Sequence, residues 1–278
     1  MRIAIVQTTS GIDPMANAQI MVAAIAEAAA AGAAMVFAPE MAGLVDRDRR
    51  RAAGHVVAEE DSVYVAHIRN AARDHAIWVH LGSLPVRDSA VGDEQTIGKW
   101  RNRSLVIDST GQICARYDKI HLFDIDLANG ESWRESSAYS PGGTAVTVDT
   151  PLGVLGLTIC YDLRFSALFD ALGAAGASII TVPSAFTVPT GQAHWHILLR
   201  ARAIEQGCFI IAPAQCGTHE DGRTTYGHSL VVDPWGGILL DAGDGPSVSL
   251  VDIDLDRIAE VRTRLPALAH RRNFKHPN

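Results

Sequence analysis

The sequence predicts an α/β fold, because apolar runs typical of buried strands alternate with Ala-rich segments of helical periodicity along the 278-residue chain. A second observation is a weak internal repeat. VIDSTGQI at 106–113 parallels VVDPWGGI at 231–238, and MVFAPE at 35–40 parallels IITVPS at 179–184. Two related halves would give two sheets packed together with helices outside, although convergent turn chemistry could produce the same repeat.

The elements follow in a regular order. In the first half we expect strand MRIAIVQ, helix 15–31, strand MVFAP, helix 62–75, strand AIWVHLGSLPV (76–86) and a hairpin near 101–117. In the second half we expect strand 153–159, helix 164–175, strand 177–183, helix 192–206, strand 208–214 and hairpins over 226–253. The Asp and Gly of each repeated hairpin suit a tight turn between antiparallel strands.

We predict one domain over 1–278, because no linker, low-complexity tract or charge run divides the chain. Roughly the last 15 residues, around PALAHRRNFKHPN, form a polar tail that we expect to pack on a partner subunit.

The bulk composition limits the classes of partner. Apolar residues make up 47% and charged residues 20%, and the net charge is −7 with the basic residues scattered. This pattern argues against nucleic acid and anionic membranes as partners, and no apolar run approaches the ~20 residues that span a bilayer. The four cysteines form no CxxC pair, which favours a reduced, cytoplasmic protein.

Cys160 is the first candidate for chemistry. It follows the apolar strand VLGLTI and enters a turn before a helix, in the run GLTICYDLRF. In open α/β sheets, ligands bind outside the carboxyl ends of strands, and free N–H groups at a helix start can receive negative charge. The position suits a nucleophile, and a buried structural cysteine fits it equally well.

A nucleophilic thiol needs a base or a cation, because its ordinary pKa of ~8.5 leaves little thiolate at neutral pH. Glu40 ends the apolar run AAMVFAPE, where a carboxylate is costly to bury unless it is used or paired, so it is a candidate base. A capping role in a loop is the alternative. Lys119, in the alternating run ARYDKIHLF, would stabilise thiolate and oxyanion if it points into a cavity, although most strand lysines face solvent.

Glu40, Lys119 and Cys160, in this order, resemble the catalytic residues of the nitrilase, or carbon–nitrogen hydrolase, superfamily. The matching motifs are APE, YDKIHLFD and GLTICYDLRF, and the similarity runs from AIVQ to HRRNF. Later motifs resemble the branch of deaminated glutathione amidases and omega-amidases: PSAF, AHW, LLRARAIE, YGHS and VVDPWG. The resemblance implies a four-layer αββα sandwich of two mixed sheets with helices outside, no cofactor, and a homodimer or larger homo-oligomer.

The resemblance also implies a second glutamate near the lysine. RESSAYSPGG fits the branch spacing from Glu-Ser to Pro-Gly, which assigns Glu135 to hold Lys119 and orient the substrate. Glu131 is also followed by Ser but lacks that spacing.

The implied reaction is amide hydrolysis through a thioester. Glu40 accepts the Cys160 proton as sulfur attacks the amide carbon, and Lys119 and the backbone N–H of Tyr161 stabilise the oxyanion. Glu40 then protonates the leaving amine and activates water.

Three further residues are candidates for substrate binding. Arg164 suits a substrate carboxylate, and Phe186 and Trp195 could form a pocket wall or ordinary core. Asp162 is expected to pair with Arg164 and stabilise the turn. Cys114, Cys208 and Cys216 are interpreted as small core residues, and His121 and His228 as structural histidines.

We expect no metal. His194 and His196 form an H-x-H pair, but they open a helical pattern and lack a third nearby ligand. His196 and Ser166 also depart from the branch pattern, which often has an acidic residue and usually has Pro at these positions.

The best function is a thiol amidase acting on a linear carboxamide, with deaminated glutathione or 2-oxoglutaramate as the expected small-molecule substrate. An N-carbamoyl-amine or nitrile hydrolase of the same superfamily is the alternative. A non-catalytic scaffold is disfavoured, because Glu40, Lys119 and Cys160 are all present.

Overall fold

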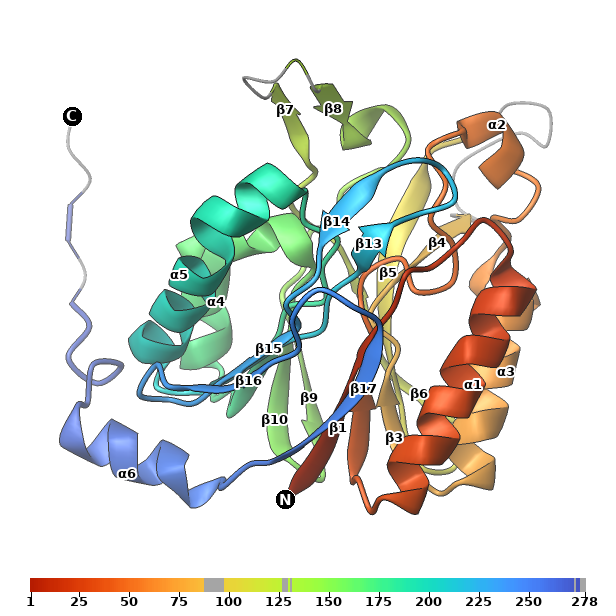
Figure 1. Cartoon of the computed structure of the whole chain (residues 1–278). Coiled ribbons are helices and arrows are strands. Elements are labelled where there is room, and N and C mark those ends of the chain that lie inside the picture. The colour runs from red at the N-terminus through yellow and green to blue at the C-terminus, as the bar shows by residue number, and fades with distance from the viewer. Residues whose placement is uncertain (88–97, 127–129, 131, 273, 276–278) are drawn as a thin grey trace.

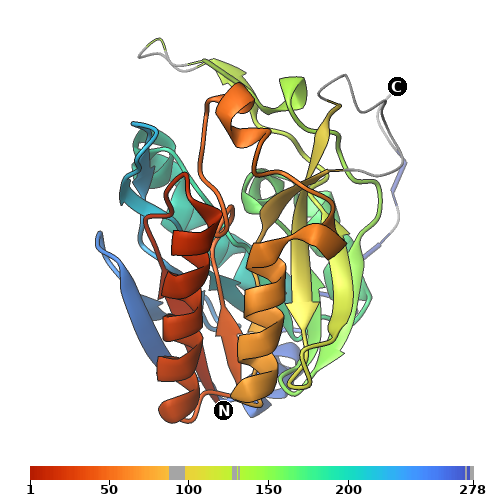
Figure 2. The same ribbon diagram turned by 90° about the vertical axis from the view of Figure 1, so that its right-hand side faces the viewer.

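Two β-sheets pack face to face, with helices on their outer faces (Figure 1). The structure is a computed structural model that describes residues 1–87, 98–126, 130, 132–272, 274 and 275. The α1 and α3 helices cover one sheet and α4 and α5 cover the other, which confirms the predicted αββα layers. In the turned view α1 and α3 lie side by side in front of their sheet (Figure 2).

The first sheet combines parallel and antiparallel strands. Its order is β17 (Ser247–Asp252), β1 (Arg2–Gln7), β2 (Met35–Phe37), β3 (Trp78–His80), β5 (Trp100–Ile107) and β4 (Leu84–Arg87), with β6 (Ile113–Asp118) also paired to β5. The strands β1, β2 and β3 are parallel to one another, and β17 and β5 are antiparallel to their neighbours.

The second sheet repeats this plan. Its order is β16 (Ile238–Asp241), β15 (Leu230–Val232), β12 (Phe209–Ala212), β11 (Ile179–Thr181), β10 (Gly153–Leu157) and β9 (Val146–Thr150). Again three parallel strands, β10, β11 and β12, have an antiparallel strand on one side and an antiparallel hairpin on the other. The two motif pairs of the internal repeat therefore occupy matching places, β2 with β11 and β5–β6 with β15–β16.

Strand alternation sets the layers. In β1, Ile3 and Ile5 belong to the core shared with the second sheet, whereas Ala4 and Val6 pack beneath α1 and α3. Because successive strand side chains point to opposite faces, one apolar run serves both layers. Each buried Ile or Val side chain of β1 contributes about 1.5–3 kcal/mol by leaving water.

The helices begin and end where local chemistry allows. Asp13 caps α1, its Oδ1 accepting from Met15 N at 2.8 Å, and Gly207 ends α5 at a left-handed φ of 53°. The α-helices are α1 (Pro14–Ala30), α2 (Arg49–Ala52), α3 (Val63–Asp74), α4 (Ser166–Ala174), α5 (Val188–Gln206) and α6 (Asp256–Arg264), and the 3₁₀ turns are η1 (Glu59–Asp61), η2 (Glu135–Ser137) and η3 (Cys160–Arg164).

Two expected strands differ from the structure. The run 76–86 breaks into β3 and β4 at Gly82, where a Cβ would lie 2.0 Å from the Pro39 carbonyl oxygen. The hairpins over 226–253 also divide, because β17 leaves β16 and pairs with β1 in the other sheet.

Two small hairpins stand at the end of the molecule where the parallel strands finish (Figure 1). They are β7 (Asp124–Asp126) with β8 (Ser132–Arg134), and β13 (Cys216–Thr218) with β14 (Thr224–Tyr226). No helix among the described residues is long and apolar enough to cross a membrane.

Candidate active site

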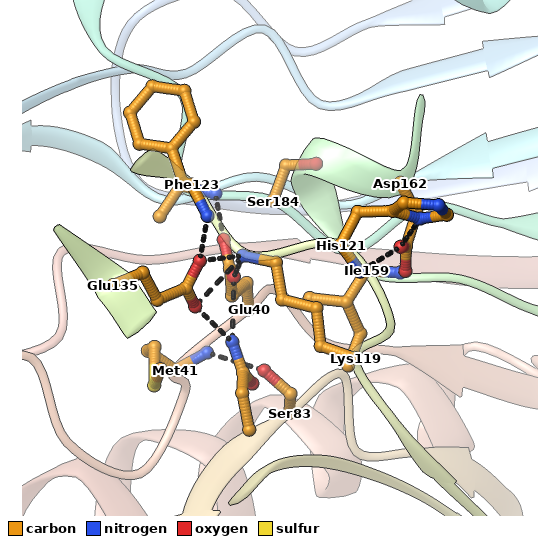
Figure 3. Close-up of polar contacts among 12 residues, drawn as sticks. Glu40, Met41, Ser83, Lys119, His121, Phe123, Glu135, Ile159, Asp162 and Ser184 are labelled. Carbon is orange, nitrogen blue, oxygen red and sulfur yellow. Dashed lines mark hydrogen bonds and ion pairs between the residues drawn. The ribbon is translucent and has the colours of Figure 1, made fainter. Parts of the chain in front are cut away.

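Lys119 lies between two carboxylates at the ends of the strands (Figure 3). Its Nζ is 2.9 Å from Glu40 Oε1 and 3.1 and 2.9 Å from the two Glu135 oxygens. Glu40 follows β2, Lys119 follows β6 and Glu135 opens η2, so three separate segments meet at one ammonium. The Lys119 side chain is 2% exposed, which makes this a buried charge cluster.

Neutral groups donate further hydrogen bonds to the Glu40 and Glu135 carboxylates. Asn102 Nδ2, on β5, donates to Glu40 Oε1 at 2.9 Å and lies 3.4 Å from Glu135 Oε1. The backbone N–H of Ala185 donates to Glu40 Oε2 at 2.9 Å, and that of Phe123 donates to Glu135 Oε2 at 2.7 Å. A buried carboxylate that accepts several hydrogen bonds is held in one orientation.

Cys160 opens the turn η3, three residues after β10 ends, and its backbone is strained. Its φ of 50° is in the left-handed region, which is uncommon for a residue with a Cβ, and its N–H donates to Pro183 O at 2.9 Å. The next N–H, that of Tyr161, has no acceptor among the described residues. A free donor beside a buried thiol is the arrangement that an oxyanion requires.

Asp162 holds this turn from behind. Its carboxylate is fully buried and accepts from Tyr117 Oη at 2.6 Å and from the N–H of Ile159 at 2.9 Å. The other oxygen accepts from the backbone N–H of His121 at 3.0 Å and lies 2.7 Å from its Nδ1. Asp162 therefore joins the turn to the segment that carries Lys119.

Burial and the nearby Glu40 carboxylate keep the Cys160 thiol protonated at neutral pH. Burial, together with the nearby Glu40 carboxylate, raises the pKa of Cys160 well above its ordinary value, and the Lys119 ammonium only partly opposes this. Burial by itself would lower the pKa of Lys119, but Glu135, Glu40 and Cys160 outweigh it and hold that pKa well above its ordinary value. The lysine is thus a permanent cation, and the thiol needs a base.

A cavity of about 250 Å³ opens onto these groups. Glu40, Lys119, Glu135 and Cys160 all line it, and Phe186 forms part of the wall. Four arginines also line it: Arg47, Arg49, Arg134 and Arg223.

Residues 2–263 match the family described as Carbon-nitrogen hydrolase. The chain belongs to this family. A protein of Yersinia enterocolitica named "Deaminated glutathione amidase" is 43% identical over 242 residues, which cover 87% of this chain and 82% of that protein.

Solved structures of other proteins also resemble this chain. The C. elegans NitFhit protein superposes with a TM-score of 0.88 at 38% identity, covering 98% of this chain and 65% of that one. The amidase from Nesterenkonia sp. AN1, in a Glu-to-Gln mutant showing the result of Michael addition of acrylamide at the active site cysteine, superposes with a TM-score of 0.77 at 29% identity, covering 96% and 98%.

Two predicted substrate-binding residues of this carbon–nitrogen hydrolase, Arg164 and Trp195, do not line the cavity. Arg164 does not line the cavity; its Nη2 is 3.2 Å from His194 Nδ1 and its guanidinium lies over the rings of Tyr161 and Phe186. The predicted pairing of Asp162 with Arg164 is therefore wrong, because Asp162 is already satisfied by Tyr117, Ile159 and His121.

Trp195 is 1% exposed and is not part of the cavity wall either. Its Nε1 donates to His228 O at 2.8 Å, and its ring packs against Phe186, so it supports the wall from behind. Cys114 is exposed rather than in the core, whereas Cys208 and Cys216 are buried as predicted. Glu131 lies outside the described residues.

Sequence reasoning missed Asn102 and the cavity arginines. Asn102 sits in WRNRSLVI, where alternation alone makes it one inward polar residue among several. Its Oδ1 is buried without a partner among the described residues, an unmet acceptor beside the charge cluster.

Proposed function

We propose that this carbon–nitrogen hydrolase is an amidase with Cys160 as nucleophile, Glu40 as acid–base group and Lys119 as electrostatic stabiliser. The observation that supports it best is the buried ammonium held by Glu40 and Glu135 beside a buried thiol at a cavity. A purely structural cluster would gain nothing from opening onto a cavity, whereas a reacting amide needs that access.

In the first half of the reaction, Sγ attacks the amide carbon while its proton passes to Glu40. The negative charge that develops on the carbonyl oxygen is stabilised by Lys119 Nζ and the Tyr161 N–H, and removal of one such donor typically costs ~10²–10³-fold in rate. Glu40 then returns the proton to the amide nitrogen, the carbon–nitrogen bond breaks, and a thioester remains.

In the second half, Glu40 removes a proton from a water molecule that attacks the thioester. Collapse of this second tetrahedral species expels the Cys160 sulfur, which takes up the proton held by Glu40. Glu135 does not move a proton in this scheme; it holds Lys119 in place and keeps it charged.

For the substrate we propose deaminated glutathione or a similar omega-amide of an α-keto acid, such as 2-oxoglutaramate. The name of the Yersinia relative supports the choice. The cavity supports it as well, because arginines line it. Arg134 pairs with Asp126 at 2.8 Å and Arg223 pairs with Asp221 at 2.9 Å, so the proposal relies chiefly on Arg47 as the partner of a substrate carboxylate. Guanidinium groups suit carboxylates of this kind.

The experiment is a product screen with purified protein. Both keto-acid amides should release 2-oxoglutarate, with a dipeptide from deaminated glutathione and ammonia from 2-oxoglutaramate, whereas Cys160→Ala should release none. Turnover of N-carbamoyl amino acids or nitriles in preference to both amides would reject the substrate while keeping the nucleophile.

The proposal also places the enzyme in the cytoplasm as a homodimer or larger assembly. Free cysteines suit a reducing compartment. Packing of the C-terminal tail on a partner stays part of this proposal; in the structure, Arg271 of this tail bonds Asp170 and Gln206 of its own chain.

A further inference from the structure

A group of metal-ligating side chains lies outside the cavity, on the outer side of the second sheet. His196 on α5 places Nε2 2.9 Å from Asp241 Oδ2, at the end of β16, and His228, after β14, places Nδ1 2.8 Å from Asp241 Oδ1. One ligand atom from each residue lies within 4.8 Å of the others. None of the three residues lines the cavity of the proposed amidase.

Carboxylates lie on both sides of the His228 ring. Its Nε2 lies 3.0 Å from Asp244 Oδ1, so each ring nitrogen faces a carboxylate oxygen. Two carboxylates and two imidazoles thus gather in one place, which is a set of donors that suits a divalent cation.

We propose that His196, His228 and Asp241 bind a divalent transition metal of the zinc class. Imidazole nitrogens suit zinc and its neighbours, whereas magnesium and calcium prefer oxygen ligands alone. Ligand atoms of a tetrahedral site lie about 3.3 Å apart, because each bond is ~2.0–2.1 Å. The three ligand atoms lie within 4.8 Å of one another, so any two of them need to approach by at most about 1.5 Å to reach this spacing.

Asp244 supplies the outer contact that such sites use. A histidine that ligates through one nitrogen commonly donates its other N–H to a carboxylate, which holds the ring orientation and strengthens the ligand. Asp244 is mostly exposed, so it costs little to keep charged. The three side chains leave a fourth position for water.

The bound metal would brace the wall of the cavity. It would join α5, the segment after β14 and the end of β16, which lie next to one another in the structure (Figure 1). The His228 carbonyl accepts from Trp195, and Trp195 packs on Phe186, which lines the cavity. Metal binding is thus connected to the wall without touching the reacting groups.

The sequence did not predict this site, because the histidine next to His196 in the sequence is His194, whereas the histidine near it in the structure is His228. His194 faces Arg164, and the remaining ligands come from positions 32 and 45 residues further along the chain. Only the hairpin topology brings them together.

The experiment measures metal binding directly. EDTA-treated, tag-free protein carrying Cys160→Ala and Cys114→Ser, which keeps zinc off the nucleophile and the exposed thiol, is titrated with ZnCl₂ in a calorimeter. We expect one saturable zinc per chain, a higher melting temperature with zinc, and visible d–d absorption with Co²⁺ in its place.

Variants then identify the ligands. His196→Asn and Asp241→Asn should each weaken zinc binding at least ~10-fold, and Asp244→Asn by ~10–100-fold, as for outer contacts elsewhere. His194→Asn, two residues away on the same helix, should bind as the parent does. Absence of saturable binding by the parent, or equal binding by His196→Asn and His194→Asn, would overturn the proposal.

Discussion

The proposed reactivity of Cys160 would depend on its neighbours rather than on an intrinsically acidic thiol. Burial and Glu40 raise its pKa, so the resting side chain is neutral and is not an exposed thiolate. Its strained turn, with the Glu40 carboxylate and the Lys119 ammonium nearby, distinguishes it from the other cysteines. In the proposed mechanism, attack on the substrate is therefore coupled to proton transfer.

The first prediction follows from that coupling. Cys160→Ala should abolish turnover with an unchanged circular dichroism spectrum. Cys114 is exposed and would be alkylated regardless of chemistry, so the labelling control uses Cys114→Ser. In that active variant, iodoacetamide should modify Cys160 in step with the loss of activity, as peptide mass spectrometry would show. Inactivation with Cys160 unmodified would contradict the assignment.

The second prediction separates two neighbouring glutamates. Glu135→Gln removes one of the two carboxylates that hold Lys119, and should lower kcat by about 10²-fold by weakening electrostatic stabilisation. Glu131→Gln, the matched control four positions earlier, should leave kcat nearly unchanged. Glu40→Gln should eliminate turnover. Steady-state kinetics of the three variants measure these effects on kcat. An inactive Glu131→Gln enzyme would reject our assignment of this loop.

The sequence predicted correctly that three residues at strand ends would lie together. Glu40, Lys119 and Cys160 each end or follow a strand, and all three line one cavity, while their catalytic roles stay a prediction. Arg164 and Trp195 were harder to place, because Arg164 follows Cys160 closely and Trp195 follows the wall residue Phe186, yet neither side chain lines the cavity. Asn102 could not be distinguished, since its role depends on a contact between β5 and a segment 62 residues earlier.

Between the sheets, His80 on β3 is a neutral histidine that joins strands of both layers. Its Nε2 lies 2.9 Å from Ser104 Oγ on β5, and its Nδ1 lies 3.3 Å from Thr181 Oγ1 on β11 in the other sheet. Burial lowers the pKa of His80 to about 3. The folded protein therefore keeps this ring neutral when an unfolded chain would already bind a proton.

The third prediction follows from this shift. Below pH 6.5 His80 binds a proton in the unfolded chain but not in the folded protein. The free energy of unfolding therefore falls as the pH is lowered, down to about pH 3. His80 should account for about 2 kcal/mol of lost unfolding free energy between pH 7.5 and 5.0. Urea unfolding of the wild type and of His80→Gln at pH 7.5 and 5.0 tests this prediction. His80→Gln should have a lower free energy of unfolding than the wild type at pH 7.5, and the difference between the two proteins should be about 2 kcal/mol smaller at pH 5.0. A constant deficit would show that His80 is not the group responsible.

At the level of elements, alternation predicted the strands and helices well, but could not reveal where a strand changes partner. The break at Gly82 arises from the close Pro39 carbonyl, a contact between segments far apart in the chain. The departure of β17 to the first sheet likewise leaves no local pattern. Helix positions were better predicted, because caps such as Asp13 and Gly207 lie within the helix's own sequence.

Across the whole molecule, the two halves repeat one plan, and the site forms where their strand ends meet. Glu40 comes from the first half and Cys160 from the second, each following a strand of the parallel set. The internal repeat in the sequence is thus more than shared turn chemistry. It reflects two similar sheets, whose packing creates a cavity that neither half contains.

One outer face carries several exposed large apolar side chains. On α5, Ile197 and Ile204 are 70% and 42% exposed, and on the β15–β16 hairpin Trp235, Ile238 and Leu239 are 55%, 43% and 46% exposed. The two elements adjoin, since Arg200 Nε donates to Gly236 O at 2.8 Å. Contiguous apolar surface of this kind commonly marks a protein–protein interface.

The last prediction is that this face joins two copies of the chain. Light scattering at micromolar concentration should give twice the 29.7 kDa chain mass or more. Ile197→Glu should shift the protein toward the monomer, because a charge would be buried without a partner when the faces meet. Ile20→Glu is the matched control, since Ile20 is 52% exposed but lies on α1, on the other outer layer (Figure 1). A wild-type monomer near 29.7 kDa would reject the assembly itself. Equal dissociation of both variants, or of neither, would place the interface on another face.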